Sequence, residues 1–151
     1  MIIIGYQGIG KSSAAGADNG YIDLESSNFW IDDVRPRDWY KYYCKIALDL
    51  SKQGYVVFTS SHKEVRDYFL KRIERDKIVA VFPAKELQSA WIEKLGERFR
   101  LYKSEKNYKA LMNAKDRFKE NIDEMENWGG EFFIIDDMSY VLKDIVEELK
   151  K

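Results

Sequence analysis

A short stretch near the start of the chain has residue types and spacing that suit phosphate binding. Residues 5–12 read GYQGIGKS and fit G-x-x-x-x-G-K-[S/T], the pattern of a phosphate-binding loop, or P-loop. Glycines let such a loop turn successive N–H groups toward phosphate oxygens, and the helix that follows adds its partial positive charge. We expect Lys11 to reach the β- and γ-phosphates of a nucleotide and the Ser12 hydroxyl to bind Mg²⁺. The sequence therefore predicts a site for ATP and Mg²⁺ made by Gly5, Gly8, Ile9, Gly10, Lys11, Ser12 and Ser13.

Two acidic side chains follow the next apolar run. Residues 20–24 read GYIDL, which indicates a short strand, and Asp23 and Glu25 lie at its carboxyl end. Ligands of open α/β sheets bind at this edge. A carboxylate there accepts the proton of an acceptor hydroxyl or holds Mg²⁺ through water, so Asp23 is the leading catalytic acid. The alternative is a loop acid that faces solvent.

A second acidic pair follows the last apolar run. Residues 132–137 read FFIIDD, which locally resembles the Mg²⁺-binding strand of motor-type ATPases. Only about 14 residues follow Asp137, enough for one helix, whereas those ATPases need further strands. We therefore interpret Asp136 and Asp137 as loop acids near the nucleotide base.

Apolar runs alternate with segments of helical periodicity. Short apolar runs predict strands at 2–4, 20–24, 55–59, 78–82 and 132–135. Apolar residues at i, i+3 and i+4 predict helices at 37–53, 63–75, 85–98 and 107–127, and a last helix capped by Ser139. The buried stripe of the 37–53 helix includes Tyr42 and Ile46. Strands separated by helices are typical of βαβ units, so we expect one α/β domain, residues 1–151, with a parallel sheet covered on both faces.

Composition excludes several classes of protein. The chain has 151 residues, of which 45% are hydrophobic, with 9 Gly and 2 Pro, so it is neither disordered nor collagen-like. A net charge of −1 argues against a general nucleic-acid binder. Cys44 and His62 are the only residues of their types, which argues against disulfides and Cys- or His-rich metal sites. The sequence shows neither a secretory signal nor a long apolar run, so we expect a cytoplasmic protein without membrane contact.

The charge balance hides a strongly basic segment. Residues 98–119 carry eight basic and two acidic side chains, whereas residues 120–151 carry three basic and ten acidic ones. A solvated helix face is one interpretation of the basic segment. A cationic flap over a polyphosphate is the other, and an ATPase associated with nucleic acid is a weaker third.

With its P-loop after the first strand, the chain resembles the P-loop kinases of small molecules: nucleoside monophosphate kinases, gluconate kinase and shikimate kinase. Residues 57–68 also resemble the third-strand region of gluconate-kinase-like proteins, in which a small polar turn precedes a helix that bears an arginine. The resemblance implies a three-layer P-loop NTPase fold with a five-stranded parallel sheet in the order 2-3-1-4-5. It also implies an arginine-bearing helical lid after strand 4, which falls on residues 98–119.

The resemblance further implies ATP- and Mg²⁺-dependent phosphoryl transfer to a small-molecule acceptor, a nucleoside or deoxynucleoside monophosphate first. Catalysis is expected from Lys11, Asp23, Arg66 and Arg98, and acceptor binding from Asp23, Glu25, Arg35, Arg37, Ser60, His62 and Arg66. A gluconate- or shikimate-type metabolite kinase is the alternative enzyme. A nucleotide-binding module without turnover is the other alternative. Two features favour it: the sequence leaves few residues for the helix after the motif, and Thr59, Ser60 and Ser61 occupy the place where many P-loop proteins have an Asp.

Overall fold

The computed structural model describes residues 1–16, 19–29 and 34–151. Its centre is a five-stranded sheet, made by β1 (Ile2–Gly5), β2 (Tyr21–Asp23), β3 (Val56–Thr59), β4 (Ile78–Pro83) and β5 (Glu131–Ile135). The strands are all parallel and lie in the order β2-β3-β1-β4-β5. The predicted strands and their order are therefore confirmed.

The strand sequences explain which strands are central. Every residue of β1, β3 and β4 is buried, as expected for β-branched and apolar runs with helices over both faces. Ile2 of β1 is in register with Val57 of β3 and Ile78 of β4, which fixes the centre of the sheet. β5 lies at an edge and leaves Phe132 and Ile134 partly exposed.

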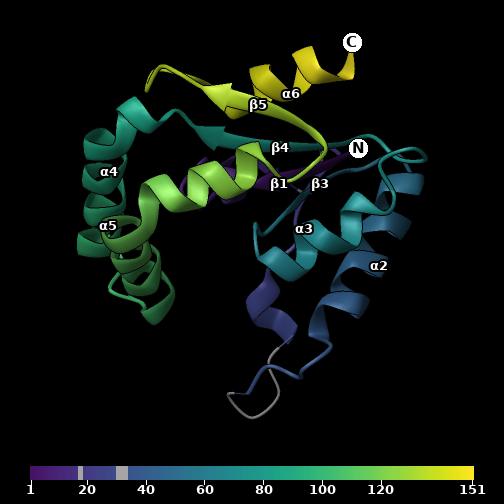
Figure 1. Cartoon of the computed structure of the whole chain (residues 1–151), viewed down its shortest axis with the longest axis horizontal. Helices are drawn as coiled ribbons and strands as arrows, with labels where there is room; N and C mark the ends of the chain where they lie inside the picture. The colour runs from purple at the N-terminus through teal and green to yellow at the C-terminus, as the bar shows by residue number, and fades with distance from the viewer. Residues whose placement is uncertain (17–18, 30–33) are drawn as a thin grey trace.

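Helices cover both faces of the sheet. They are α1 (Lys11–Ala14), α2 (Trp39–Lys52), α3 (Lys63–Leu70), α4 (Gln88–Leu101), α5 (Glu105–Glu126) and α6 (Leu142–Lys150), with 3₁₀ turns at Ser26–Phe29 and Lys85–Leu87. Figure 1 shows α2, α3 and α5 on one side of the sheet and α6 on the other, where α6 also contacts α1. No helix in the described ranges is long and apolar enough to cross a membrane.

Three details of the predicted helices are wrong. α3 ends at Leu70 rather than at 75, and a series of turns leads from it to β4. α6 begins at Leu142 with Val141 at its N-cap, because the backbone N–H and the hydroxyl of Ser139 both bond Asp137 Oδ1 in the preceding turn. In α2 the buried stripe is Trp39, Tyr43, Cys44, Ala47 and Leu48, so Tyr42 and Ile46 face outward.

The core extends to the carboxyl ends of the strands, where the P-loop lies. Tyr6, directly after β1, packs edge-on against Phe118 of α5 at 5.8 Å between ring centroids and also contacts Trp91 of α4. Cys44 is fully buried, and burial raises the pKa of its thiol to about 12, which agrees with a packing role. The P-loop is therefore held by a rigid aromatic core.

Candidate phosphate-binding site

The loop between β1 and α1 has the backbone conformation that its glycines allow. Gly8 and Gly10 have φ of 87° and 101°, values that side-chain-bearing residues seldom adopt. Gly5 is needed for space, since a Cβ there would lie 2.6 Å from Ile9 Cδ1 and 2.9 Å from Lys11 Cδ. The three motif glycines thus permit a tight turn over the end of β1.

The same turn exposes a set of backbone donors. In the turn between β1 and α1 and at the start of α1, the N–H groups without an acceptor among the described residues are those of Gln7, Gly8, Gly10, Lys11, Ser12 and Ser13. Such unpaired donors are usual at the start of a helix, where they donate to a bound anion or to water. α1 itself has only four residues, as the short distance between the motif and the next predicted strand leads one to expect. The site therefore depends on the loop amides more than on a long helix.

Two aromatic side chains hold the loop from its outer side. Trp91 Nε1 donates to Gln7 O at 2.9 Å, and the Tyr140 hydroxyl donates to Ile9 O at 2.8 Å. In a planar trans peptide the N–H points opposite to the C=O. Bonds that fix the carbonyls of Gln7 and Ile9 therefore turn the N–H groups of Gly8 and Gly10 to the opposite side.

These two residues form one unit with a lysine. The rings of Trp91 and Tyr140 stack at 6.0 Å with 14° between their planes, and Lys94 Nζ donates to the Tyr140 hydroxyl at 2.8 Å. Burial, together with nearby Arg98, lowers the pKa of Lys94. No motif in the sequence marks Trp91 and Tyr140 as loop contacts or Lys94 as their partner, because these residues meet only in the folded chain.

Lys11 lies where the ends of β1 and β3 meet. Its Nζ donates to Gly5 O at 3.1 Å and to Thr59 O at 3.4 Å. Burial lowers the pKa of Lys11, while the charges of Asp23 and Glu25 act to raise it. The ammonium thus contacts the ends of β1 and β3 and interacts electrostatically with the acids at the end of β2.

The two acids lie close together, and a lysine from α5 holds one of them. Lys106 Nζ is 2.6 Å from Glu25 Oε1. Burial alone would raise the pKa of Glu25, but Lys106 and a hydrogen bond with Asp23 bring it below its ordinary value. Burial and its neighbour Glu25 raise the pKa of Asp23, against the opposing charge of Lys11. The pKa values of the two carboxyls are therefore shifted in opposite directions, that of Asp23 upward and that of Glu25 downward.

A second group of polar side chains lies at the end of β3. Arg35 Nη1 is 3.1 Å from His62 Nε2, and His62 Nδ1 is 2.8 Å from Ser60 Oγ. Burial and the Arg35 charge lower the pKa of His62 to about 4, so the imidazole is neutral at physiological pH. Tyr43 links this group to β2, because its hydroxyl donates to Leu24 O at 2.6 Å and accepts from Ser60 N at 2.8 Å.

The remaining candidate arginines have different surroundings. Arg98 lies close enough to Lys11 to lower its pKa, and within the described residues Arg98 forms no ion pair. Arg66 is buried, and its guanidinium bonds Ser61 O and both the backbone and the carboxylate of Glu124. Arg37 is exposed. The structure thus brings Arg98 to the P-loop and uses Arg66 to join α3 to α5.

The polar groups expected to hold Mg²⁺ are few. Ser12 and Ser13 are exposed at the start of α1. No cluster of three or more His, Cys, Asp or Glu side chains suits a metal ion in the part of the chain that is described. Asp137 bonds the turn at Ser139, and this bonding lowers its pKa. A cation here would depend on Ser12 and on oxygens of its ligand.

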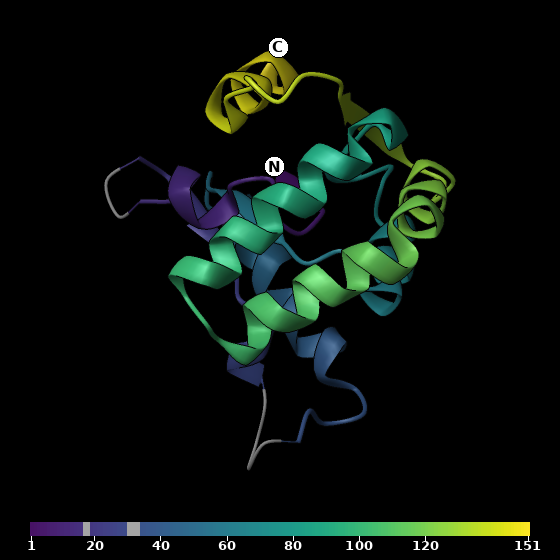
Figure 2. The same ribbon diagram turned by 90° about the vertical axis from the view of Figure 1, so that its left-hand side faces the viewer.

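The basic segment 98–119 forms the end of α4 and most of α5. Figure 2 shows α4 and α5 side by side as a helical hairpin. Ser104 caps α5, since its hydroxyl accepts from Asn107 N at 3.1 Å. α5 departs from helical geometry at Arg117, with φ of −137°. The ion pair between Lys106 and Glu25 brings the first turn of α5 to the acids after β2.

No protein-family model matches this chain, and no curated protein matches its sequence. Any functional conclusion therefore depends on the chemistry of the residues described above.

Proposed function

We propose that the chain is a P-loop NTPase-type kinase that uses ATP and Mg²⁺ to phosphorylate a small-molecule acceptor. One observation carries the proposal. The loop of the G-x-x-x-x-G-K-[S/T] motif presents N–H groups without protein acceptors, and its Lys11 interacts electrostatically with Asp23 and Glu25. Phosphoryl transfer needs this pairing of a phosphate cradle with an acceptor site, because its catalysis is mostly positioning and charge stabilisation.

The residues of the loop fit a nucleoside triphosphate with Mg²⁺. In this proposal, the backbone amides around the phosphates are those of Gly8, Ile9, Gly10 and Ser13. The Ser12 hydroxyl would hold the cation, which it can reach because Ser12 is exposed at the start of α1. Ile9 N bonds Tyr6 O at 3.3 Å, a long bond that ligand binding would replace. Lys11 would exchange its carbonyl contacts for phosphate oxygens. Bound Mg²⁺ would neutralise charge on the β- and γ-phosphates.

The acceptor site would lie between the ends of β2 and β3. Asp23, with its raised pKa, suits a group that accepts the hydroxyl proton of the acceptor. Arg35 and Arg37 would bind an acceptor phosphate, with Ser60 and His62 beside them, which favours a nucleoside or deoxynucleoside monophosphate. Arg98, close to Lys11, would stabilise the transferring group, and segment 98–119 would act as the lid. The bonds of Arg66 to Glu124 favour a supporting role for that arginine, which holds the lid helix to α3.

Two alternatives use the same site. A gluconate- or shikimate-type metabolite kinase would place a polyhydroxylated acceptor against Asp23 and Glu25. A nucleotide-binding module without turnover is favoured by the four-residue α1 and by Thr59, whose side chain is fully buried where other P-loop proteins carry a metal-associated Asp. The cytoplasm, which supplies ATP and Mg²⁺, stays the predicted compartment.

ATP consumption measured with Mg²⁺ against a panel of nucleoside monophosphates and metabolites tests the proposal. Lys11→Ala is the matched variant, because it removes the charge that faces phosphate and leaves the apolar core intact. We expect turnover with one acceptor class, and ATP should raise the melting temperature of the parent more than that of Lys11→Ala. Equal ATP stabilisation of the two proteins would refute the P-loop assignment. ATP binding without turnover on any acceptor would favour the binding module.

A further inference from the structure

A cavity of about 300 Å³ lies at the end of the sheet opposite the P-loop. It is lined by the last part of α3 and the turns after it: Tyr68, Lys71, Arg72, Glu74 and Arg75. These turns lead to Lys77, whose carbonyl accepts from Ile2 N at the amino end of β1. Lys11 lies beyond the carboxyl end of the same strand. The cavity is therefore separate from the candidate phosphate-binding site.

A second hollow of about 200 Å³ continues this cavity toward α2. It shares Tyr68 and Arg72 with the first, and α2 adds Lys45, Leu48, Asp49 and Lys52. Together the two hollows are lined by five cationic and two anionic side chains, an excess of three positive charges. No aspartate or glutamate in the described ranges forms an ion pair with any of the five cations.

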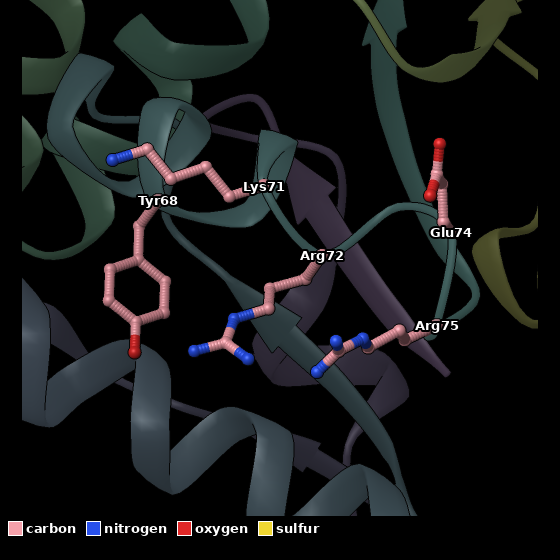
Figure 3. Close-up of a pocket in the computed structure, with 5 residues that line it drawn as sticks. All are labelled: Tyr68, Lys71, Arg72, Glu74 and Arg75. Carbon is pink, nitrogen blue, oxygen red and sulfur yellow. The ribbon is translucent and has the colours of Figure 1, made fainter.

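The two arginines converge. Figure 3 shows the guanidinium groups of Arg72 and Arg75 turned to the side of the Tyr68 ring, whereas the Lys71 ammonium points away from them. The guanidinium of Arg72 lies 5.8 Å from the centre of the Tyr68 ring. Like charges that face one hollow repel each other, and Glu74 and Asp49 compensate only part of the positive charge, so a bound anion would relieve the remaining repulsion.

The chemistry of these groups selects the class of anion. A guanidinium presents paired N–H donors that match phosphate oxygens, and lysines from α2 add charges on the opposite wall. An excess of three charges, spread over two joined hollows, exceeds what a single carboxylate or sulfate compensates. A chain of two or more phosphates carries enough negative charge to match this excess.

We propose that this cavity is a second binding site, for a small molecule that carries a chain of phosphates. Arg72 and Arg75 would bind the phosphates from the α3 side, and Lys45 and Lys52 from the α2 side. The Tyr68 ring offers an apolar surface for a base, if the chain belongs to a nucleotide. The site does not depend on the proposed kinase activity, because it shares no residue with the P-loop.

Calorimetric titration with tripolyphosphate tests this site in a Lys11→Ala background, in which the P-loop no longer contributes. We expect tripolyphosphate to bind the Lys11→Ala protein. Arg72→Gln with Arg75→Gln should weaken that binding by at least about tenfold, since each lost guanidinium removes charge-assisted hydrogen bonds. Lys45→Gln with Lys52→Gln should weaken it in the same direction, which provides a second test if the arginine variant folds poorly.

Lys143→Gln with Lys151→Gln is the control, since it removes two exposed charges in and directly after α6, which lies on the other side of the sheet from α2 and α3 (Figure 1) and lines neither hollow. We expect its affinity within about twofold of the Lys11→Ala protein. Equal weakening in the control, or no binding to the Lys11→Ala protein, would overturn the proposal. ATP that binds more tightly than tripolyphosphate would identify a nucleotide as the source of the phosphates. Equal ATP binding by the parent and Lys11→Ala would instead refute the P-loop assignment and leave this site standing.

Discussion

Removing the hydroxyl of Tyr140 isolates the contact that orients the P-loop. Tyr140→Phe keeps the ring stacked on Trp91 but deletes the donor to Ile9 O and the acceptor of Lys94. Burial raises the pKa of Tyr140, so the parent hydroxyl is a donor across the working pH range. The variant therefore changes two hydrogen bonds and little else.

The expected magnitude follows from those two bonds. A partly buried hydrogen bond contributes about 1 kcal/mol to stability, and a bond to a charged group about 1.5–3 kcal/mol. Because water can reach part of this group, we expect the free energy of unfolding to fall by about 1–2 kcal/mol. For a chain of this length, that corresponds to a melting temperature lower by roughly 2–8 °C. ATP affinity should fall by about tenfold, since the N–H of Gly10 is no longer held toward phosphate.

Urea unfolding followed by tryptophan fluorescence, together with ATP titration, measures both effects. Tyr42→Phe is the matched control, because Tyr42 of α2 is 61% exposed and, among the described contacts, its hydroxyl makes no hydrogen bond. The control should change neither quantity. If Tyr140→Phe loses stability but binds ATP like the parent, the hydroxyl does not orient the loop. If it loses neither, the contact itself contributes nothing.

Three further predictions concern the acids, the histidine and the lid. Asp23→Asn should lower turnover by at least about 100-fold and leave ATP affinity within a few-fold of the parent, whereas Asp136→Asn should change turnover little. Equal turnover in the parent and in Asp23→Asn would assign the base to another residue. The pKa of His62 is about 4 in the folded protein against 6.5 in the unfolded chain. Between these two pH values the unfolded state binds a proton that the folded state does not, so the free energy of unfolding falls as the pH drops from 6.5 to 4. Acid titration of unfolding should show the parent losing about 3 kcal/mol more than His62→Gln over that range, and parallel curves would contradict a buried neutral imidazole. The backbone amides of residues 102–109 should exchange hydrogen quickly in the free protein and slowly with a bisubstrate analogue bound. A surface pair such as Lys106–Glu25 stabilises the closed lid by no more than about 1 kcal/mol. Exchange that the analogue does not change would rule out a lid.

Local sequence pattern determined the fold to a large extent. β-branched and apolar runs can satisfy their backbone only in a sheet that is covered on both faces, so the strands were predictable one by one. The order of the strands agreed with the resemblance to P-loop kinases. The turn of the motif followed from its glycines, since Gly8 and Gly10 have the positive φ that other residues avoid.

Helix ends and buried faces depended on tertiary contacts. Ser139 had the type of a capping residue, but its donors bond Asp137, and α6 begins only at Leu142. The apolar pattern of α2 allowed more than one stripe, and packing against the sheet buried Tyr43 and Ala47 while it left Tyr42 exposed. Periodicity alone cannot distinguish two adjacent apolar stripes.

The sequence by itself determined which residues the proposal assigns to phosphate binding, because the spacing from Gly5 to Ser12 is local and one turn of chain contains it. Only the tertiary structure decided what surrounds that turn. Trp91 and Tyr140 hold the loop from segments more than 80 residues away, and Lys106 meets Glu25 across 81 positions of sequence. Arg66, which the sequence offered as a catalytic residue, bonds Glu124 instead. Such contacts leave no local signal, since each depends on how the helices pack over the sheet.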